Sequence, residues 1–307
     1  MDPQKIFLAM FYQVVKEVFG EDDLKYIFNK TRLLKLFILT IDEVGKSIGY
    51  DEIPFAYGWY KYGLFSHNIY QNYEPIDFEG LLLTMQDLDK IPPELKNIKD
   101  RMKDIISNLK NKFKSSNKEF DKYIHRDLPE EKFKKFYEAV DGVNNAFDLL
   151  LNKTTLLDCF RISKTNSLKE AIKRLENAVV FEYMKEDREE ALYYYTDSLM
   201  LFLDNYEDNE TCRTILAEMK EIFNREVFSI IAPYFEGLCG NENYKKIEIS
   251  THKKVLSKKI NNLYDKIDSI ESKYSGYFPT YDDLLNNIRN INIDEDLNDK
   301  ISKILLE

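Results

Sequence analysis

The sequence is poor in the residues that interrupt helices. Its 307 residues include 10 glycines and 8 prolines, too few for a turn-rich all-β fold. It is richer in core-forming residues, with 20 Phe, 21 Tyr and a hydrophobic fraction of 44%. A chain of this length can bury a sizeable core. These features predict a mostly α-helical protein.

Cysteine and histidine are also scarce. Cys159, Cys212 and Cys239 form no CxxC arrangement, so a disulfide framework or a zinc ribbon is not expected. The three histidines lie in separate segments. Few histidines are therefore available to bind a metal or to act as a general base. The motifs GxxxxGK[ST], GxGxxG, HExxH and GxSxG are missing. We therefore expect no catalytic residues, no metal and no cofactor, and an enzyme of another class is the third interpretation.

Long apolar runs and a basic-led apolar leader are missing as well. No stretch approaches the roughly 20 apolar residues of a membrane span, and Asp2 and Pro3 are typical of a helix start rather than a signal peptide. The sequence thus predicts a cytoplasmic protein with no membrane contact. The formal net charge of −10 argues against a generally basic nucleic-acid binder.

Charge is nevertheless uneven along the chain. Residues 186–210 contain nine acids and one base, whereas residues 245–259 contain six lysines and one acid. The lysines can form a solvated helix face or contact phosphate. In the acidic region, three consecutive tyrosines, Tyr193, Tyr194 and Tyr195, would point in different directions from a helix. At least one of them should then be exposed, which makes this segment a candidate protein-facing surface.

Hydrophobic spacing predicts helices along most of the chain. The first runs over Pro3–Phe19 and ends at Gly20, and a short helix near residues 24–29 precedes one that Thr31 caps. Pro92 and Pro93 open a long helix towards Arg126. Further helices are expected near residues 130–152, 167–185, 187–205 and 209–237. Ser167 and Asp187 would cap the second and third of these, and Pro233 would kink or end the fourth. Others are expected along an apolar seam from Leu256 to Tyr274, after Pro279, and at the end of the chain.

Residues 53–66, IPFAYGWYKYGLFS, break the helical pattern. Aromatic alternation after a proline predicts a short strand, followed by a turn at Gly63, and Ser66 is a good cap for the next helix. Alternation would put Tyr57 and Trp59 on one face and Tyr60 and Tyr62 on the other. One pair can then fill the core while the other meets solvent or a partner.

Residues 30–90 carry a resemblance to known proteins. The stretch from Arg32 to Tyr70 resembles the Panacea (SocA-like) domain and the YwgA-like winged-helix proteins. The corresponding residues are Leu33 to Phe37 with Lys35, then Trp59, Tyr62, Gly63, Phe65, Ser66 and Tyr70, with Leu64 where those families have proline. The resemblance implies a winged-helix module with a regulatory or antitoxin-like role, without shared catalytic machinery.

Together these patterns predict a winged-helix-like module over residues 1–91, a long connecting helix over 92–128 and a helical bundle over 129–307. The expected function is that of a non-enzymatic regulatory or adaptor protein with a protein or nucleoprotein partner. A nucleic-acid-binding regulator that uses the winged-helix module is the alternative, and a homo-oligomer is left open. The candidate partner-binding residues are Tyr60, Lys61, Tyr62, Ser66, His67, Lys253, Lys254, Lys258 and Lys259.

Overall fold

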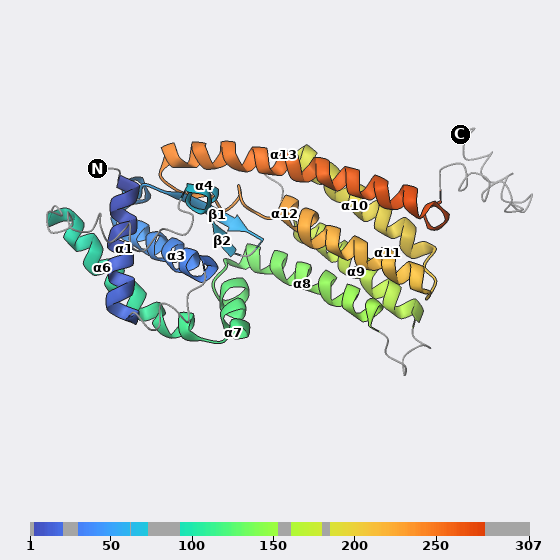
Figure 1. Cartoon of the computed structure of the whole chain (residues 1–307), viewed down its shortest axis with the longest axis horizontal. Helices are drawn as coiled ribbons and strands as arrows, with labels where there is room; N and C mark the ends of the chain where they lie inside the picture. The colour runs from blue at the N-terminus through green and yellow to red at the C-terminus, as the bar shows by residue number, and fades with distance from the viewer. Residues whose placement is uncertain are drawn as a thin grey trace, which may run out of the picture.

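The computed structural model describes residues 3–20, 30–61, 63–72, 93–152, 161–179 and 185–279. Within these ranges the chain is mostly helical, as the sequence predicts, and the molecule is elongated (Figure 1). The N-terminal helices and a small sheet form one end, and a helical bundle forms the other. The helices predicted near residues 24–29, after Pro279 and at the end of the chain lie outside the described residues.

Three helices pack together at the N-terminal end: α1 (Pro3–Phe19), α3 (Lys30–Ile48) and α6 (Pro93–Lys114). Gly20 follows α1 with a φ of 80°, the left-handed conformation in which glycine ends a helix. This confirms the predicted first helix. Helix α3 begins at Lys30, so Thr31 lies in its first turn and is not the cap that we predicted for this helix. Sequence patterns place helix ends to within one or two residues.

A three-stranded antiparallel sheet follows α3. Strand β1 (Ala56–Tyr60) pairs with β2 (Gly63–Phe65) through the predicted turn, and Gly63 has a φ of 81°. The opposite edge of β1 pairs with β3 (Cys239–Gly240), which comes from much later in the chain. Helix α4 (His67–Asn72) starts after the hairpin, and the Ile69 amide donates to Ser66 Oγ over 3.2 Å. The predicted cap at Ser66 is confirmed.

Both faces of β1 are buried. Trp59 is 8% exposed and packs on Phe133, with 5.6 Å between ring centroids, and Tyr57 is fully buried. On the other face, a Cβ added at Gly58 would collide with the carbonyl oxygen of Tyr234. A segment distant in sequence thus covers this face at Gly58, while Tyr60 on the same face is half-buried and Tyr62 lies outside the described residues.

The predicted helix over residues 92–128 is broken. Helix α6 ends at Lys114, and a capping box starts α7 (Asn117–Lys122): the Glu119 amide donates to Ser116 Oγ, while Glu119 accepts from the Ser116 amide. A π-helical turn, η3 (Tyr123–Asp127), follows. Arg32 stabilises the break, because its guanidinium donates to the Phe113 carbonyl over 2.8 Å at the end of α6.

The other end of the molecule is a helical bundle. Its helices are α8 (Glu131–Leu151), α9 (Arg161–Ala178), α10 (Lys185–Asp204), α11 (Glu210–Ile222), a π-helical turn η5 (Phe223–Val227) and α12 (Phe228–Ile231). Helices α9 and α10 begin before Ser167 and Asp187, so these two predicted caps are wrong. Ser167 lies in the interior of α9, whereas Asp187 lies in the first turn of α10, where a carboxylate is favoured by the helix dipole. Helix α12 ends shortly before Pro233, as predicted.

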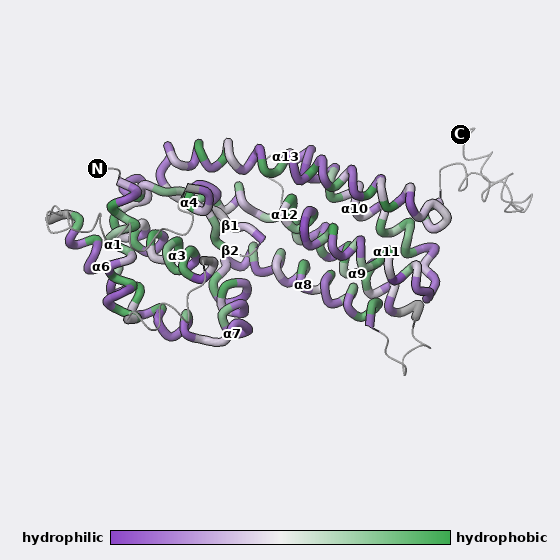
Figure 2. Tube along the Cα trace, viewed as in Figure 1, coloured by the Kyte–Doolittle hydropathy of each residue, from purple (hydrophilic) through white to green (hydrophobic). Residues whose placement is uncertain are grey.

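The longest helix, α13 (Glu242–Lys273), connects the two ends (Figure 1). It contacts α4 and β1 at one end and α10, α11 and η5 along the bundle. Its predicted apolar seam is buried at Leu256, Ile260, Leu263, Ile267 and Ile270. The mixed colours along this helix in Figure 2 reflect the alternation of this seam with polar residues. Within the described ranges, no helix is both long enough and apolar enough to cross a membrane.

Candidate functional site

The hairpin and α13 meet at a buried set of polar side chains, which we call the polar cluster. It consists of Tyr60, Ser66, His67, Tyr234, Glu248 and His252. Tyr60 is half-buried, and the other five are between 0% and 6% exposed. Buried polar groups of this kind are stable only when they are hydrogen-bonded.

Glu248 is the centre of the polar cluster. Its Oε1 accepts from Ser66 Oγ and from the Asn68 amide over 2.7 Å, and its Oε2 accepts from the His67 amide over 3.1 Å and from Tyr234 Oη over 2.6 Å. The carboxylate thus satisfies the free amides in the first turn of α4. Burial raises the pKa of Glu248, and these four donors oppose that shift. All four acceptor positions are used, which fits the ionised form.

Two neutral histidines complete the polar cluster. His67 Nε2 and His252 Nδ1 are 2.8 Å apart, so one of these two nitrogens carries the proton of their hydrogen bond and the other accepts it. Burial lowers the pKa of His67 to about 4 and that of His252 well below its usual value. The Tyr234 ring stacks on His252 with 4.2 Å between centroids. This arrangement fixes the rings and keeps both uncharged near neutral pH.

The geometry favours a structural role for the polar cluster. The Ser66 hydroxyl donates to Glu248, and the same carboxylate also accepts from Tyr234 and from two backbone amides of α4, so all its acceptor positions are used within the network. The facing nitrogens of the two histidines are occupied by their mutual hydrogen bond. Across the described part of the chain, no group of three or more His, Cys, Asp or Glu is placed to hold a metal ion. The polar cluster therefore fastens α13 to the hairpin and to α4.

The predicted hairpin residues lie inside the molecule. Tyr60, Ser66 and His67 belong to the polar cluster, and Lys61 Nζ donates to the Asn224 carbonyl over 2.9 Å, which links the turn to η5. Tyr62 lies outside the described residues. The structure thus brings three of the predicted residues together, but in a buried junction rather than on an open surface.

Sequence reasoning missed the partners of these residues, Tyr234, Glu248 and His252. A usable signal was present for two of them. His252 and Glu248 lie four and eight residues before Leu256, so they continue the apolar seam towards the start of α13. Polar residues that continue a buried seam must find partners inside the protein. The pattern could therefore have identified them as members of a buried network, although not their partners.

The predicted lysines divide into two groups. Lys253, Lys254 and Lys258 are exposed on α13 and form no ion pair with another described residue. Lys259 instead pairs with the buried Glu226 over 2.8 Å. Burial tends to raise the pKa of Glu226, but Lys259 and Lys266 hold it below its usual value. Lys259 therefore fastens α13 to η5, and three of the four predicted lysines face solvent.

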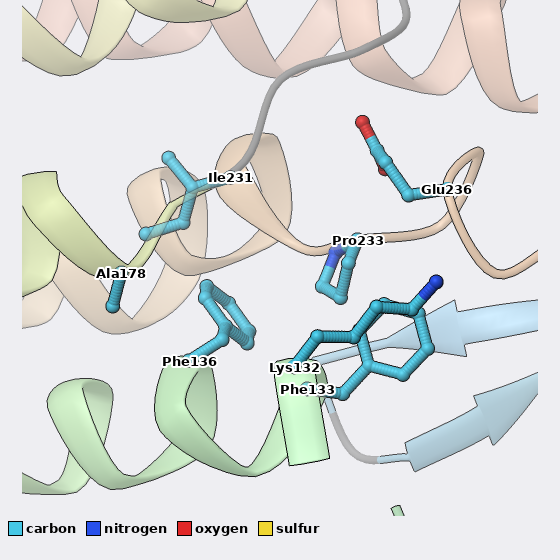
Figure 3. Close-up of a pocket in the computed structure, with 7 residues that line it drawn as sticks. All are labelled: Lys132, Phe133, Phe136, Ala178, Ile231, Pro233 and Glu236. Atoms are coloured by element: carbon cyan, nitrogen blue, oxygen red, sulfur yellow. The ribbon is translucent and has the colours of Figure 1, made fainter. Parts of the chain in front are cut away.

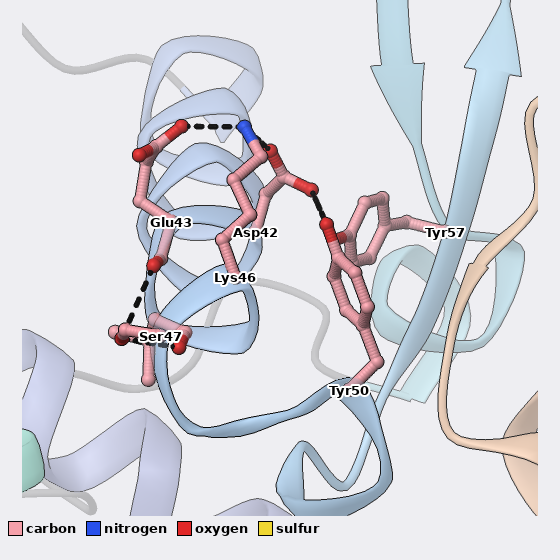
Figure 4. A network of polar contacts seen from close by, with 7 residues as sticks. Asp42, Glu43, Lys46, Ser47, Tyr50 and Tyr57 are labelled. Carbon is pink, nitrogen blue, oxygen red and sulfur yellow. Dashed lines mark hydrogen bonds and ion pairs between the residues drawn. The ribbon is translucent and has the colours of Figure 1, made fainter.

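A second polar network fastens α3 to the sheet (Figure 4). Asp42 accepts hydrogen bonds from Tyr57 Oη over 2.6 Å and Tyr50 Oη over 3.1 Å, and it pairs with Lys46 over 2.8 Å. Burial, with the carboxylate close by, raises the pKa of Tyr50 to about 12. Both phenols are thus neutral donors, which is the form that this network requires.

Two cavities among the described residues lie away from the polar cluster. One, of about 40 Å³, lies between α8, the end of α9 and the segment after α12, with Phe133, Phe136 and Pro233 in its wall and Glu236 at its edge (Figure 3). Small-molecule sites typically measure about 300–1,000 Å³, so this cavity is too small for a cofactor. A second, open groove of about 690 Å³ lies between α1, α3 and α6, and apolar residues, Arg101 and acidic residues line it.

Comparison of the chain with protein-family models, curated proteins and solved structures finds no match.

Proposed function

We propose that the protein is a non-enzymatic regulatory or adaptor protein that binds an anionic surface of a protein or nucleoprotein partner through α13. The observation that carries this proposal is the exposed trio Lys253, Lys254 and Lys258, which has no counter-ion among the described residues. Unpaired lysines on an acidic protein are a local site for negative charge.

The inner face of α13 supports this role. Glu248 and His252 fasten its first half to the hairpin, and the Lys259–Glu226 pair fastens its middle to the bundle. A helix held this way presents its outer side chains without further ordering of the backbone. Binding then costs less conformational entropy than it would on a mobile segment.

We also propose that residues 1–91 form a winged-helix-like module of the Panacea type, followed by the regions 92–128 and 129–307. The order of α3, the β1–β2 hairpin and α4 supports this, as does the capping role of Ser66. A regulatory or antitoxin-like protein of this kind would bind its partner rather than transform it.

The runner-up function is sequence-specific nucleic-acid binding. The same three lysines favour it, because they lie within two helical turns and could contact neighbouring phosphates. The two functions differ in salt dependence, since binding dominated by phosphate contacts weakens steeply as salt rises.

Affinity purification from native lysate, with and without nuclease, tests the proposal. The variant K253Q/K254Q/K258Q should lose the partner, whereas the matched control K96Q/K118Q/K122Q should keep it. The control removes the same charge from exposed lysines on α6 and α7. Retention of the partner by both variants would refute the role of α13.

Nucleic-acid binding is measured in parallel as a function of salt. We expect negligible affinity at physiological salt for the unmodified protein. Specific binding that persists there and is lost in the α13 variant would establish the runner-up instead. In that case each lost lysine should reduce the log–log salt slope by roughly 0.7 to 0.9.

A further inference from the structure

The solvent-facing side of α13 carries a line of exposed residues, which we call the outer stripe: Lys246, Lys254, Lys258, Asn261, Asp265 and Asp268. Their spacing of three, four, seven or eight residues keeps them on one side of the helix. Most of the opposite side is the buried seam that continues into the polar cluster. Apart from the hydrogen bond that Asp268 accepts from Tyr194 of α10, the outer stripe is separate from the contacts that hold α13 in place.

The outer stripe is basic before Asn261 and acidic after it. Lys254 and Lys258 form no ion pair with another described residue, and neither does Asp265. The nearest opposite charges of the outer stripe, Lys258 and Asp265, are seven residues apart, about 10 Å along a helix, and form no ion pair with each other. Lys254 and Asp268 are fourteen residues apart, about 21 Å along a helix. The complement of each half is therefore present on the surface of the same chain, although the two halves form no ion pair within it.

We infer that the outer stripe of one molecule docks on that of a second copy, with the two α13 helices antiparallel. Lys254 lies seven residues before Asn261 and Asp268 lies seven after it, while Lys258 lies three before and Asp265 four after. A two-fold axis near Asn261 therefore places Lys254 opposite Asp268 and Lys258 opposite Asp265. The symmetry repeats both pairs, as an isologous interface requires.

Tyrosines border the acidic half of the outer stripe and would meet the lysines of the second copy. Tyr194 donates a hydrogen bond to Asp268 and packs edge-on against Tyr264, with 4.9 Å between centroids. Tyr194 itself is 36% exposed. Aromatic faces stabilise a nearby ammonium group, and lysine stems pack on apolar rings. These contacts add to ion pairs that would be weak by themselves.

The paired form would cover the lysines that are assigned above to a partner. Self-association and partner binding would then compete, and the monomer would be the form that binds. The pairing itself does not depend on the proposed function, because it requires nothing beyond the chain. Its ionic contacts make it weak and sensitive to salt.

Sedimentation equilibrium from micromolar to sub-millimolar protein, at low and high salt, tests this inference. The unmodified chain should dimerise at low salt and dissociate at high salt. The reversals K254E/K258E and D265K/D268K should each be monomeric at low salt, whereas K118E/K122E on α7 should dimerise like the unmodified chain. Circular dichroism should show that all of these exposed substitutions leave the fold intact.

Mixing the two reversal variants gives the decisive result. A mixed dimer pairs every introduced glutamate with an introduced lysine, so dimerisation should return. A monomeric unmodified chain throughout, or reversal variants that dimerise like it, would overturn the inference. The monomeric D265K/D268K variant keeps every α13 lysine, so its binding to the partner tests the proposed function separately.

Discussion

Replacing Glu248 by Gln tests whether the polar cluster fastens α13 to the hairpin. The amide keeps the size and shape of the side chain but changes one acceptor oxygen into a donor NH2 group. Each carboxylate oxygen accepts two hydrogen bonds, from Ser66 and Asn68 on one side and from His67 and Tyr234 on the other. Whichever way the amide turns, its nitrogen faces two donors.

The expected loss of stability follows from the two hydrogen bonds that the replaced oxygen can no longer accept. Each side of the carboxylate receives one hydroxyl and one backbone amide. The hydroxyl can rotate away, whereas the amide in the first turn of α4 is fixed and buried. An unsatisfied buried donor costs about 1–3 kcal/mol, so we expect Glu248→Gln to destabilise the protein by about 3 kcal/mol.

Urea unfolding at pH 7 measures this loss. Trp59 is the single tryptophan and lies on β1, so its fluorescence reports on the hairpin, while circular dichroism reports on the helices. Glu138→Gln is the matched control, because it makes the same substitution at an exposed position of α8. Surface substitutions usually change stability by less than about 0.5 kcal/mol. Equal effects from the two variants would refute the fastening role of Glu248.

The remaining predictions also concern this junction. The lowered pKa values of His67 and His252 mean that the unfolded chain binds protons first as pH falls. Urea midpoints should thus fall between about pH 6.5 and pH 4, with the raised pKa of Glu248 offsetting part of the loss. Flat midpoints over this range would contradict the buried neutral pair. Trp59→Ala should cost about 3–5 kcal/mol, as for a core aromatic, and a loss below about 1 kcal/mol would contradict its burial. Gly58→Ala should destabilise by about 1–3 kcal/mol, because its Cβ meets the Tyr234 backbone, and unchanged unfolding would mean that this segment does not cover the sheet.

Helix α13 organises the molecule through its two opposite sides. Its inner side joins the N-terminal end to the bundle through the seam, the polar cluster and the Glu226 pairs. Its outer side is left to solvent and to any partner. A substitution on the inner side should therefore act on stability first, whereas one on the outer side should act on association. The predictions for Glu248 and for Lys254 separate these two effects on a single helix.

The sequence by itself determined the local elements. Apolar spacing predicts α1 and the seam of α13, and a helix-initiating Ser66 after a glycine turn predicts the start of α4. These features depend on residues a few positions apart, whose relation is set by helix and turn geometry. Composition likewise predicts a mostly helical chain, since few glycines and prolines interrupt it.

Tertiary structure alone decided which of the predicted residues lie together and which stay free. Pairing of β3 with β1 and burial of both faces of the sheet depend on segments that are distant in the chain. The same holds for the candidate site, where Ser66 and Glu248 are 182 positions apart. No local periodicity encodes such pairs, because the energy of a buried polar group depends on whichever partner the fold places beside it. Lys254 and Lys259 are similar in sequence context, and only the position of Glu226 leaves one exposed and the other paired.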